Sequence, residues 1–214
     1  MSEWLEKLGD KSITKEDLLR QIKQDFSLVP TVIDGLSSSK ATIRYGCGKV
    51  LMDLSGTNPD RLYKYMDTFM RLLRSRHRIL VWNGTAIIAN LARVDTERKF
   101  DAIFGEYFAL LNDEYLVTVA NTVANSAKIA LAKPYLIQKI ADELLATDKL
   151  ATTPHLTEEC KRVIAEKAID SFSLFFDKIE DKEKVIAFVS QYRNSPRKTL
   201  KKKADEFLSR FGQE

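Results

Sequence analysis

The sequence predicts an all-α protein built as a right-handed superhelix, or solenoid, of about five stacked helix pairs. Gly and Pro are scarce, at 8 and 5 residues of 214, whereas all-β folds use many of both in their turns. Apolar residues recur at steps of three and four along most of the chain, which is the period of an amphipathic helix. Polar joints recur about every 37 residues, a step typical of stacked helix-pair repeats.

The first long amphipathic segment is expected over Thr14–Leu36. Thr14 is followed three residues later by Asp17, which is the spacing of a helix N-cap, and Pro30 is expected to kink the helix. Three serines at 37–39 end the pattern, and Ala41–Leu54 resumes it as the second helix of the pair. The sequence therefore predicts one helix pair before the Gly and Pro of residues 56–59.

The same alternation repeats to the end of the chain. Further first helices are expected over Asp60–Leu73, Lys99–Leu111, Pro134–Ala146 and Lys182–Tyr192. Further second helices are expected over Arg76–Leu91, Glu114–Leu131, Glu159–Phe176 and Arg197–Phe211. One such pair cannot bury its apolar face alone, so neighbouring pairs must stack. We therefore expect a single repeat domain over 1–214, with an N-terminal cap at 1–13 and repeats at about 14–57, 58–95, 96–132, 133–179 and 180–212.

Internal similarity supports this register. Val50–Leu54 superposes on Ile87–Leu91 at a shift of 37, which also aligns Tyr45 with Trp82. With its period, its helix pairing and segments such as SSSKATIRYGCGKVLMDLS and NSPRKTLKKKADEFLSRF, the chain resembles HEAT-repeat proteins over nearly its whole length. Armadillo repeats, the neighbouring class, carry three helices and a Trp and Asn one turn apart. Here the residue one turn after Trp82 is Ala86, so that signature is absent.

Basic residues are segregated along the chain. Four of the five second helices lie largely in windows that contain Lys or Arg but no acid, at 35–52, 68–94, 115–141 and 192–204. The fourth second helix is mixed, because it carries Glu166 and Asp170 beside Lys167. The HEAT resemblance implies that second helices line the concave surface, which would then attract phosphates or an acidic protein segment. Alternatively, these residues only solvate helix ends, where cations complement the helix dipole.

Candidate binding residues are the basic, aromatic and amide side chains of the expected concave face. They are Arg44, Tyr45, Lys49, Arg76, Arg78, Trp82, Asn83, Asn90, Asn121, Lys128, Arg197, Lys198 and Lys201. The two aromatic rings either offer their faces to a ligand or pack between repeats. Buried amides need hydrogen-bond partners, so the asparagines either bind a peptide or nucleic-acid backbone or pair across repeats.

The sequence lacks the common catalytic and cofactor motifs. It contains no GxxxxGK[ST], GxGxxG or GxSxG, and neither His77 nor His155 has zinc-ligand spacing to Cys, Asp or Glu. We expect no cofactor, no metal, no catalytic residue and no small-molecule substrate. The leading hypothesis is a non-catalytic protein–protein interaction scaffold. The alternative is a nucleic-acid-binding solenoid related to alkylpurine DNA glycosylases, with Trp82, Asp53 and Asp113 as its inner-face candidates.

A cytoplasmic location is expected, without a membrane partner. The first residues are charged and have no apolar signal core, and no run approaches the roughly 18 apolar residues that a membrane span needs. Cys47 and Cys160 lie in apolar helical stretches outside any CxxC pair, so both are expected to be reduced thiols. Thr147–Thr157 is expected to be an insertion, because one repeat step there lengthens to about 45 residues.

Overall fold

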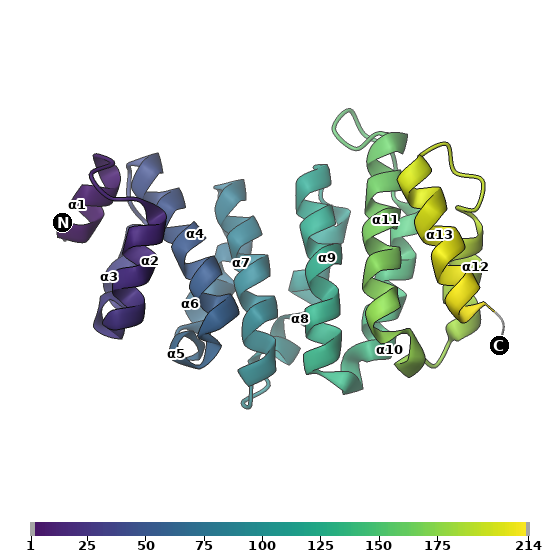
Figure 1. Cartoon of the computed structure of the whole chain (residues 1–214), viewed down its shortest axis with the longest axis horizontal. Helices are drawn as coiled ribbons and strands as arrows, with labels where there is room; N and C mark the ends of the chain where they lie inside the picture. The colour runs from purple at the N-terminus through teal and green to yellow at the C-terminus, as the bar shows by residue number, and fades with distance from the viewer. Residues whose placement is uncertain (1–2, 213–214) are drawn as a thin grey trace. The chain divides into compact units, whose positions relative to one another are not determined.

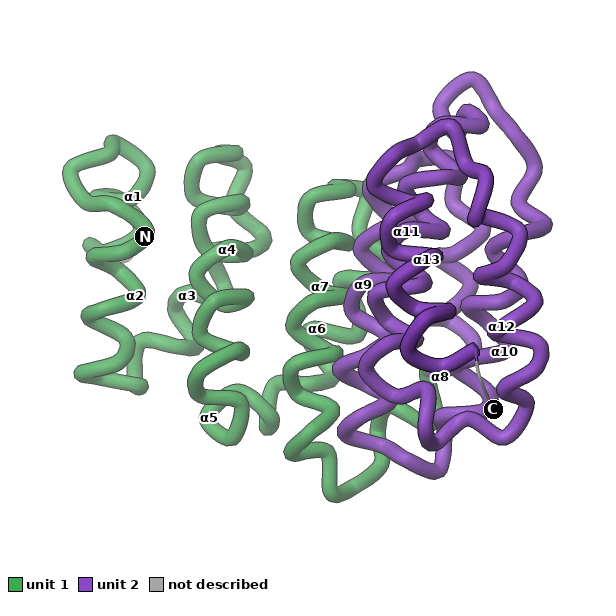
Figure 2. The backbone as a smooth tube through the Cα atoms, turned by 45° about the vertical axis from the view of Figure 1, so that its right-hand side comes forward, with its two compact units in different colours: residues 1–103 green, residues 104–214 purple. Residues whose placement is uncertain are grey.

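A computed structural model describes residues 3–212 of the chain, and its regular elements there are helices (Figure 1). The all-α class predicted from the sequence is confirmed. The described residues fall into two compact units, which we call unit 1 (residues 1–103) and unit 2 (residues 104–214), coloured separately in Figure 2. The boundary lies inside α8 (Lys99–Ala109). Each unit is described by itself.

Unit 1 is built around two long helices. Its α-helices before α8 are α1 (Glu3–Gly9), α2 (Lys15–Gln24), α3 (Val29–Gly35), α4 (Ala41–Thr57), α5 (Pro59–Tyr63), α6 (Met66–Arg71) and α7 (Arg78–Leu91). Short 3-10 turns occupy Phe26–Leu28, Leu72–Arg74 and Ala92–Val94. The long helices α4 and α7 pack against each other. α1, α2 and α3 cover α4, and α5 and α6 cover α7. Three short helices therefore precede α4, and two precede α7.

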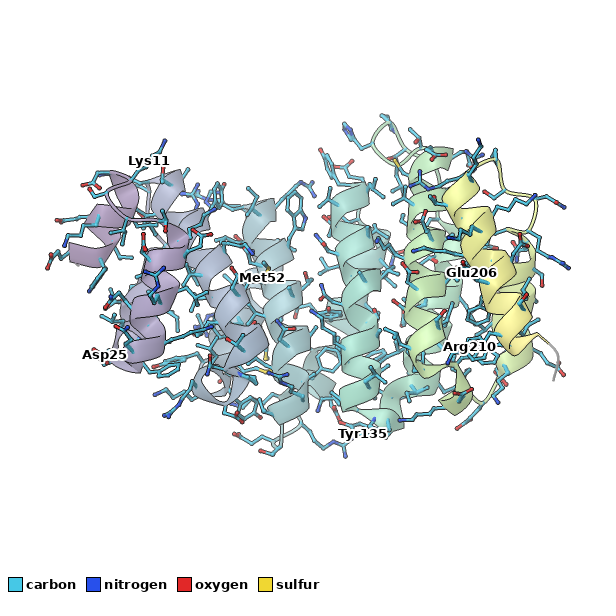
Figure 3. The ribbon with its side chains drawn as sticks, viewed as in Figure 1. Lys11, Asp25, Met52, Tyr135, Glu206 and Arg210 are labelled. Carbon is cyan, nitrogen blue, oxygen red and sulfur yellow. The ribbon has the colours of Figure 1, made fainter. Side chains whose placement is uncertain are left out.

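The helix expected over Thr14–Leu36 is interrupted. Its start is as predicted, because the Thr14 hydroxyl accepts the Asp17 amide N–H and the Asp17 carboxylate accepts the Thr14 amide N–H, both at 3.1 Å. The break lies at Asp25, at the end of α2 (Figure 3), and the kink predicted at Pro30 is wrong. The Asp25 carboxylate accepts the Ser27 amide N–H at 2.9 Å and turns the chain. Pro30 instead lies in the first turn of α3, where a missing N–H is tolerated.

The single helix expected over Asp60–Leu73 is also wrong. The structure divides it into α5 and α6, with Tyr65 at φ −103° and ψ 11° between them. A long-range contact holds the end of α5 in place: the Tyr63 hydroxyl donates to the Asp95 carboxylate at 2.7 Å and accepts the Glu97 amide N–H at 3.2 Å. Leu62 in α5 and Phe69 in α6, on either side of the break, are both fully inaccessible.

Unit 2 contains the rest of α8 and five further α-helices. These are α9 (Leu116–Ala132), α10 (Ile137–Leu145), α11 (Glu158–Phe175), α12 (Lys182–Ser190) and α13 (Lys198–Phe211). Short 3-10 turns occupy Leu110–Asn112, Pro134–Leu136, Ala146–Lys149 and Phe176–Lys178. The helices α9, α11 and α13 lie side by side with α11 in the middle (Figure 1). The hydroxyl of Ser171 donates to the backbone carbonyl of Val123 at 2.9 Å and fixes the register of α11 on α9.

The expected insertion between α10 and α11 packs back onto unit 2. Thr153 and Leu156 form an isolated antiparallel bridge, and Leu156 is 2% exposed. The ring of His155 stacks on Tyr115 with centroids 4.6 Å apart and an interplanar angle of 12°. The insertion is therefore anchored beside the start of α9.

Candidate binding surfaces

The predicted binding residues lie on the long second helices or directly before them. In unit 1, Arg44, Tyr45 and Lys49 belong to α4, Arg76 precedes α7, and Arg78, Trp82, Asn83 and Asn90 belong to α7. In unit 2, Asn121 and Lys128 belong to α9, Arg197 precedes α13, and Lys198 and Lys201 belong to α13.

The asparagines of α7 have partners on α4. The Asn90 amide nitrogen donates to the Ser55 hydroxyl at 2.9 Å, and that of Asn83 lies 3.5 Å from the Met52 sulfur. Asn83 is 7% exposed, and its amide oxygen is buried without a hydrogen-bond partner. Gly48 makes room for this oxygen, since a Cβ there would lie 2.6 Å from it. Both amides thus contribute to the packing of α4 on α7.

On α9, Asn121 has a different role. Its backbone carbonyl accepts a hydrogen bond from the Asn125 side-chain amide at 2.9 Å within the same helix. The Asn121 side chain itself is half-buried. It lies four residues after the exposed Val117 and four before the buried Asn125, at the edge of the exposed side of α9. It is the predicted amide that unit 2 leaves at its surface.

Tyr45 and Trp82 are both half-buried, so each ring is divided between core and surface. The Arg44 guanidinium lies 4.7 Å from the centroid of the Tyr45 ring, and His77 meets that ring edge-on at 6.1 Å. Trp82 shares one side of α7 with Ala86 and Asn90, at four-residue steps, and all three are partly exposed.

A cavity of about 960 Å³ lies in unit 1 between the joint before α4 and the joint before α7. We call it the joint cavity. Its lining is Ile33, Asp34, Leu36, Ser37, Ser38, Ser39, Arg44, Thr68, Arg71, Leu72, Ser75, Arg76, His77 and Leu80. The sequence pointed to Arg44 and Arg76 but missed Arg71 and His77. The basic run at 71–78 could have indicated them, since it crosses the joint between two helices.

The joint cavity is electropositive. Arg44 donates to the Ser38 carbonyl at 2.7 Å, and the Arg76 Nε donates to the His77 ring nitrogen at 3.4 Å. Desolvation, together with the charges of Arg44 and Arg76, lowers the pKa of His77 below its ordinary value of 6.5. The imidazole is therefore held toward its neutral form by its surroundings.

In unit 2, cations of the last predicted window are paired with acids of α11. Arg197 contacts Glu159 at 2.6 Å and Glu166 at 2.8 Å, and Lys203 contacts Asp170 at 2.6 Å and Glu166 at 3.5 Å. Burial alone would raise the pKa of Glu166, but hydrogen bonds from Arg197 and Thr199 and the charges of Lys203 and Arg197 lower it. Lys198 and Lys201 remain exposed.

An exposed row follows one side of α9. It consists of Val117, Asn121, Ala124, Lys128 and Leu131, at steps of three and four. Val117 is 44% exposed and Leu131 46%, and on the adjacent α11 Leu174 is 61% exposed. We call the five residues on α9 the α9 row. The sequence interpretation missed its apolar members because α9 is apolar nearly all round; their spacing is a weak signal.

The two acidic candidates of the glycosylase hypothesis have local partners in the structure. Asp53, an inner-face candidate of the glycosylase hypothesis, pairs with Lys49 at 2.6 Å, and Asp113 accepts the Tyr115 amide N–H at 2.8 Å. Among residues 3–212, no group of three or more His, Cys, Asp or Glu side chains could hold a metal ion. None of the described helices has the length and apolar character to cross a membrane.

The sequence matches no family model and no curated protein. Several solved structures are nevertheless similar in fold. The superposition on a designed armadillo repeat protein covers 96% of this chain and 90% of the designed chain, with a TM-score of 0.62 and 20% sequence identity. A second, solved in complex with the peptide (KR)4, covers 97% and 91% with a TM-score of 0.65 and 16% identity. The chain has the armadillo/HEAT-type repeat fold.

A third similar structure belongs to computationally designed armadillo repeat proteins for modular peptide recognition, with a TM-score of 0.60, 20% identity and 97% of this chain covered. The α-solenoid predicted from the sequence is thereby confirmed. In unit 1, the short helices α5 and α6 precede the long helix α7. From α9 to α13, unit 2 has one shorter α-helix before each long one. Identities of this size establish the fold and nothing further.

Proposed function

We propose that this protein is a non-catalytic scaffold that binds another protein along the exposed sides of its long second helices. The observation that carries the proposal is the α9 row, in which large apolar side chains lie exposed beside an amide and a cation. Clustered exposed apolar residues with interspersed polar groups are typical of protein interaction surfaces. Isolated examples need no such explanation, but Val117 and Leu131 lie on one side of α9, with Asn121, Ala124 and Lys128 between them.

The fold supports this proposal. One similar designed protein was solved with the basic peptide (KR)4. The present chain has a formal net charge of +4, and its second helices present Lys128, Lys198 and Lys201 at the surface. We therefore propose the opposite preference, for a partner segment that is acidic. As part of the same proposal, the scaffold works in the cytoplasm, where the two free thiols Cys47 and Cys160 would stay reduced.

Nucleic acid is the less favoured partner. A solenoid that follows a phosphate backbone needs successive cations free to replace counterions. In unit 2 the acids of α11 already neutralise Arg197 and Lys203, which interrupts such a series. The α9 row also offers more apolar surface than a phosphate backbone requires.

Site-specific photo-crosslinking in cells tests the proposal. A crosslinker replaces Leu131, on the α9 row, or Lys139, which is exposed on the first helix α10. We expect a discrete protein adduct from position 131, absent from position 139 and weakened by Lys128→Glu. Mass spectrometry of the adduct then shows whether the captured segment is acidic.

Two results would overturn the proposal. Equal adducts from both positions would mean that the α9 row has no special role. Binding of generic duplex DNA or RNA at low salt, with a steep loss between about 50 and 200 mM salt, would favour the nucleic-acid hypothesis instead. Circular dichroism of each variant checks that the helices are intact.

A further inference from the structure

Cationic and hydroxyl side chains converge on the joint cavity from two successive helix joints. Arg44 reaches it from α4, Arg71 from α6 and Arg76 from the joint before α7. Serines 37–39 and Ser75 line it at the joints themselves. Asp34, which is exposed, is the one acidic residue in the lining. The recess therefore combines an excess of positive charge with several hydroxyl groups.

The three guanidinium groups have no carboxylate within ion-pair distance in the described part of the chain. Arg44 donates to backbone carbonyls at 38 and 39, and Arg71 to the Thr68 hydroxyl at 2.9 Å. A guanidinium carries five N–H donors, so most donors of Arg71 and Arg76 remain available. The Nε of Arg44 is buried and has no hydrogen-bond partner. The cavity thus has more directed donors than acceptors.

The helix ends beside the cavity add to this imbalance. α4 and α7 both begin at these joints, with 17 and 14 residues, and neither first turn receives a side-chain cap. The first amide groups of a helix without a cap keep unsatisfied N–H donors, and the helix dipole favours an anion there. This feature reinforces the arginine cluster; the cluster and the recess are the principal evidence.

We propose that the joint cavity is a binding site for a phosphoryl group carried as a phosphate monoester. Guanidinium forks and hydroxyl donors match the three oxygens of such a group better than they match a single carboxylate. The cavity volume of about 960 Å³ exceeds the needs of a phosphate ion alone, so the group would enter attached to a larger molecule. The site belongs to unit 1, whereas the α9 row belongs to unit 2, and the proposal does not depend on the proposed function.

The two histidines of the chain provide the readout, because only His77 lines the joint cavity. The pKa of each imidazole is measured by NMR on the full chain, with inorganic phosphate, with a short phosphoserine peptide, or with chloride at matched ionic strength. A phosphoryl group among the arginines would stabilise the protonated imidazole. We expect the His77 pKa to rise with a phosphoryl ligand, while the NMR signals of His155, which stacks on Tyr115, do not respond to the ligand.

Matched variants locate the site. Arg71→Gln and Arg76→Gln change exposed side chains, so the fold should persist, and each should weaken binding roughly tenfold through loss of a charge-assisted contact. Arg20→Gln, an exposed arginine of α2 outside the cavity, should leave binding unchanged. If only the phosphoserine peptide raises the His77 pKa, the ligand of the cavity is a phosphorylated side chain. If inorganic phosphate also raises it, the cavity binds the free ion as well.

The proposal is overturned if neither phosphoryl ligand moves the His77 pKa. It is also overturned if chloride or the unphosphorylated peptide moves it equally, or if Arg71→Gln and Arg76→Gln bind as the unaltered chain does. The crosslinking test of the α9 row uses residues of unit 2, so either proposal can fail while the other stands.

Discussion

Each unit contains a carboxylate that is largely shielded from solvent, and the two carboxylates have different hydrogen-bond donors. In unit 1, Asp95 is 6% exposed and accepts hydrogen bonds from the Tyr63 phenol at 2.7 Å and from the amides of Lys99 and Phe100 at 2.8 and 3.0 Å. In unit 2, Glu166 has a side chain that is 13% exposed and accepts from Arg197 and from the Thr199 hydroxyl, with Lys203 nearby. Asp95 thus accepts hydrogen bonds from a phenol and from backbone amides, whereas Glu166 is paired with cationic side chains.

This difference shows why a basic stretch of sequence is not yet a basic surface. The windows at 68–94 and 192–204 look alike in sequence, since both contain Arg and no acid. In the second window the neighbouring helix α11 supplies the missing carboxylates. In the first, Arg71 and Arg76 face a cavity without an ion-pair partner among the described residues. The charge of a repeat surface therefore depends on the helix stacked beside it.

The largest effect is expected from Asp95→Ala. The substitution leaves the Tyr63 hydroxyl and two amides at the start of α8 without their acceptor, and should lower the free energy of unfolding by about 3 kcal/mol. Urea unfolding followed by tryptophan fluorescence measures it, because Trp4 and Trp82 both lie in unit 1. The control Glu97→Ala changes a 64%-exposed side chain and should cost less than about 0.5 kcal/mol. Equal losses would contradict this assignment.

A smaller effect is expected from Glu166→Gln. The amide keeps an acceptor for Thr199 but loses the charge that holds Arg197 and Lys203, so the free energy of unfolding should fall by about 1–2 kcal/mol. Urea unfolding followed by far-ultraviolet circular dichroism reports both units. Glu206→Gln removes an exposed partner of Lys202 as control and should change the stability by less than about 0.5 kcal/mol. An equal loss of stability in Glu206→Gln would show that the ion pairs between α11 and α13 contribute no more than an exposed ion pair does.

The smallest effect is a pH dependence. Because the pKa of Glu166 is lowered in the folded chain, the unfolded chain binds its proton first as the pH falls below about 4.5. The stabilisation is therefore complete above that pH and is lost as the pH falls through the folded value. Between pH 6 and pH 3, the free energy of unfolding should decrease less steeply for Glu166→Gln than for the unaltered chain; it is measured by urea unfolding at each pH. An equal pH dependence in the two chains would show that Glu166 does not contribute to the loss of stability in this range.

The sequence predicted much of the fold because helical period and capping are local properties. The step of about 37 residues, the Thr14 cap and the approximate positions of the long helices all follow from nearby residues. The breaks at Asp25 and after Tyr63 were missed. The apolar pattern continues through both, and the second depends on Asp95, which is 32 residues away.

The candidate surface was less predictable, because it depends on contacts between helices. Arg44 and Arg76 do meet at one cavity, but the pairing of Arg197 with Glu159 and Glu166 spans 38 and 31 residues of sequence. The exposure of Val117 and Leu131 also depends on how neighbouring helices cover α9. Neither the pairing of Arg197 nor the exposure of Val117 and Leu131 can be predicted from the sequence of one helix alone.

The buried thiol of unit 1 has a practical consequence for kinetics. Cys47 is fully inaccessible in α4, and burial raises its pKa to about 12, so almost none of it is thiolate near neutral pH. A thiol reagent can modify it only after the core around α4 opens. In a Cys160→Ser chain, the rate at which the reagent labels Cys47 would therefore measure how often the core of unit 1 opens, at a residue that the sequence already contains.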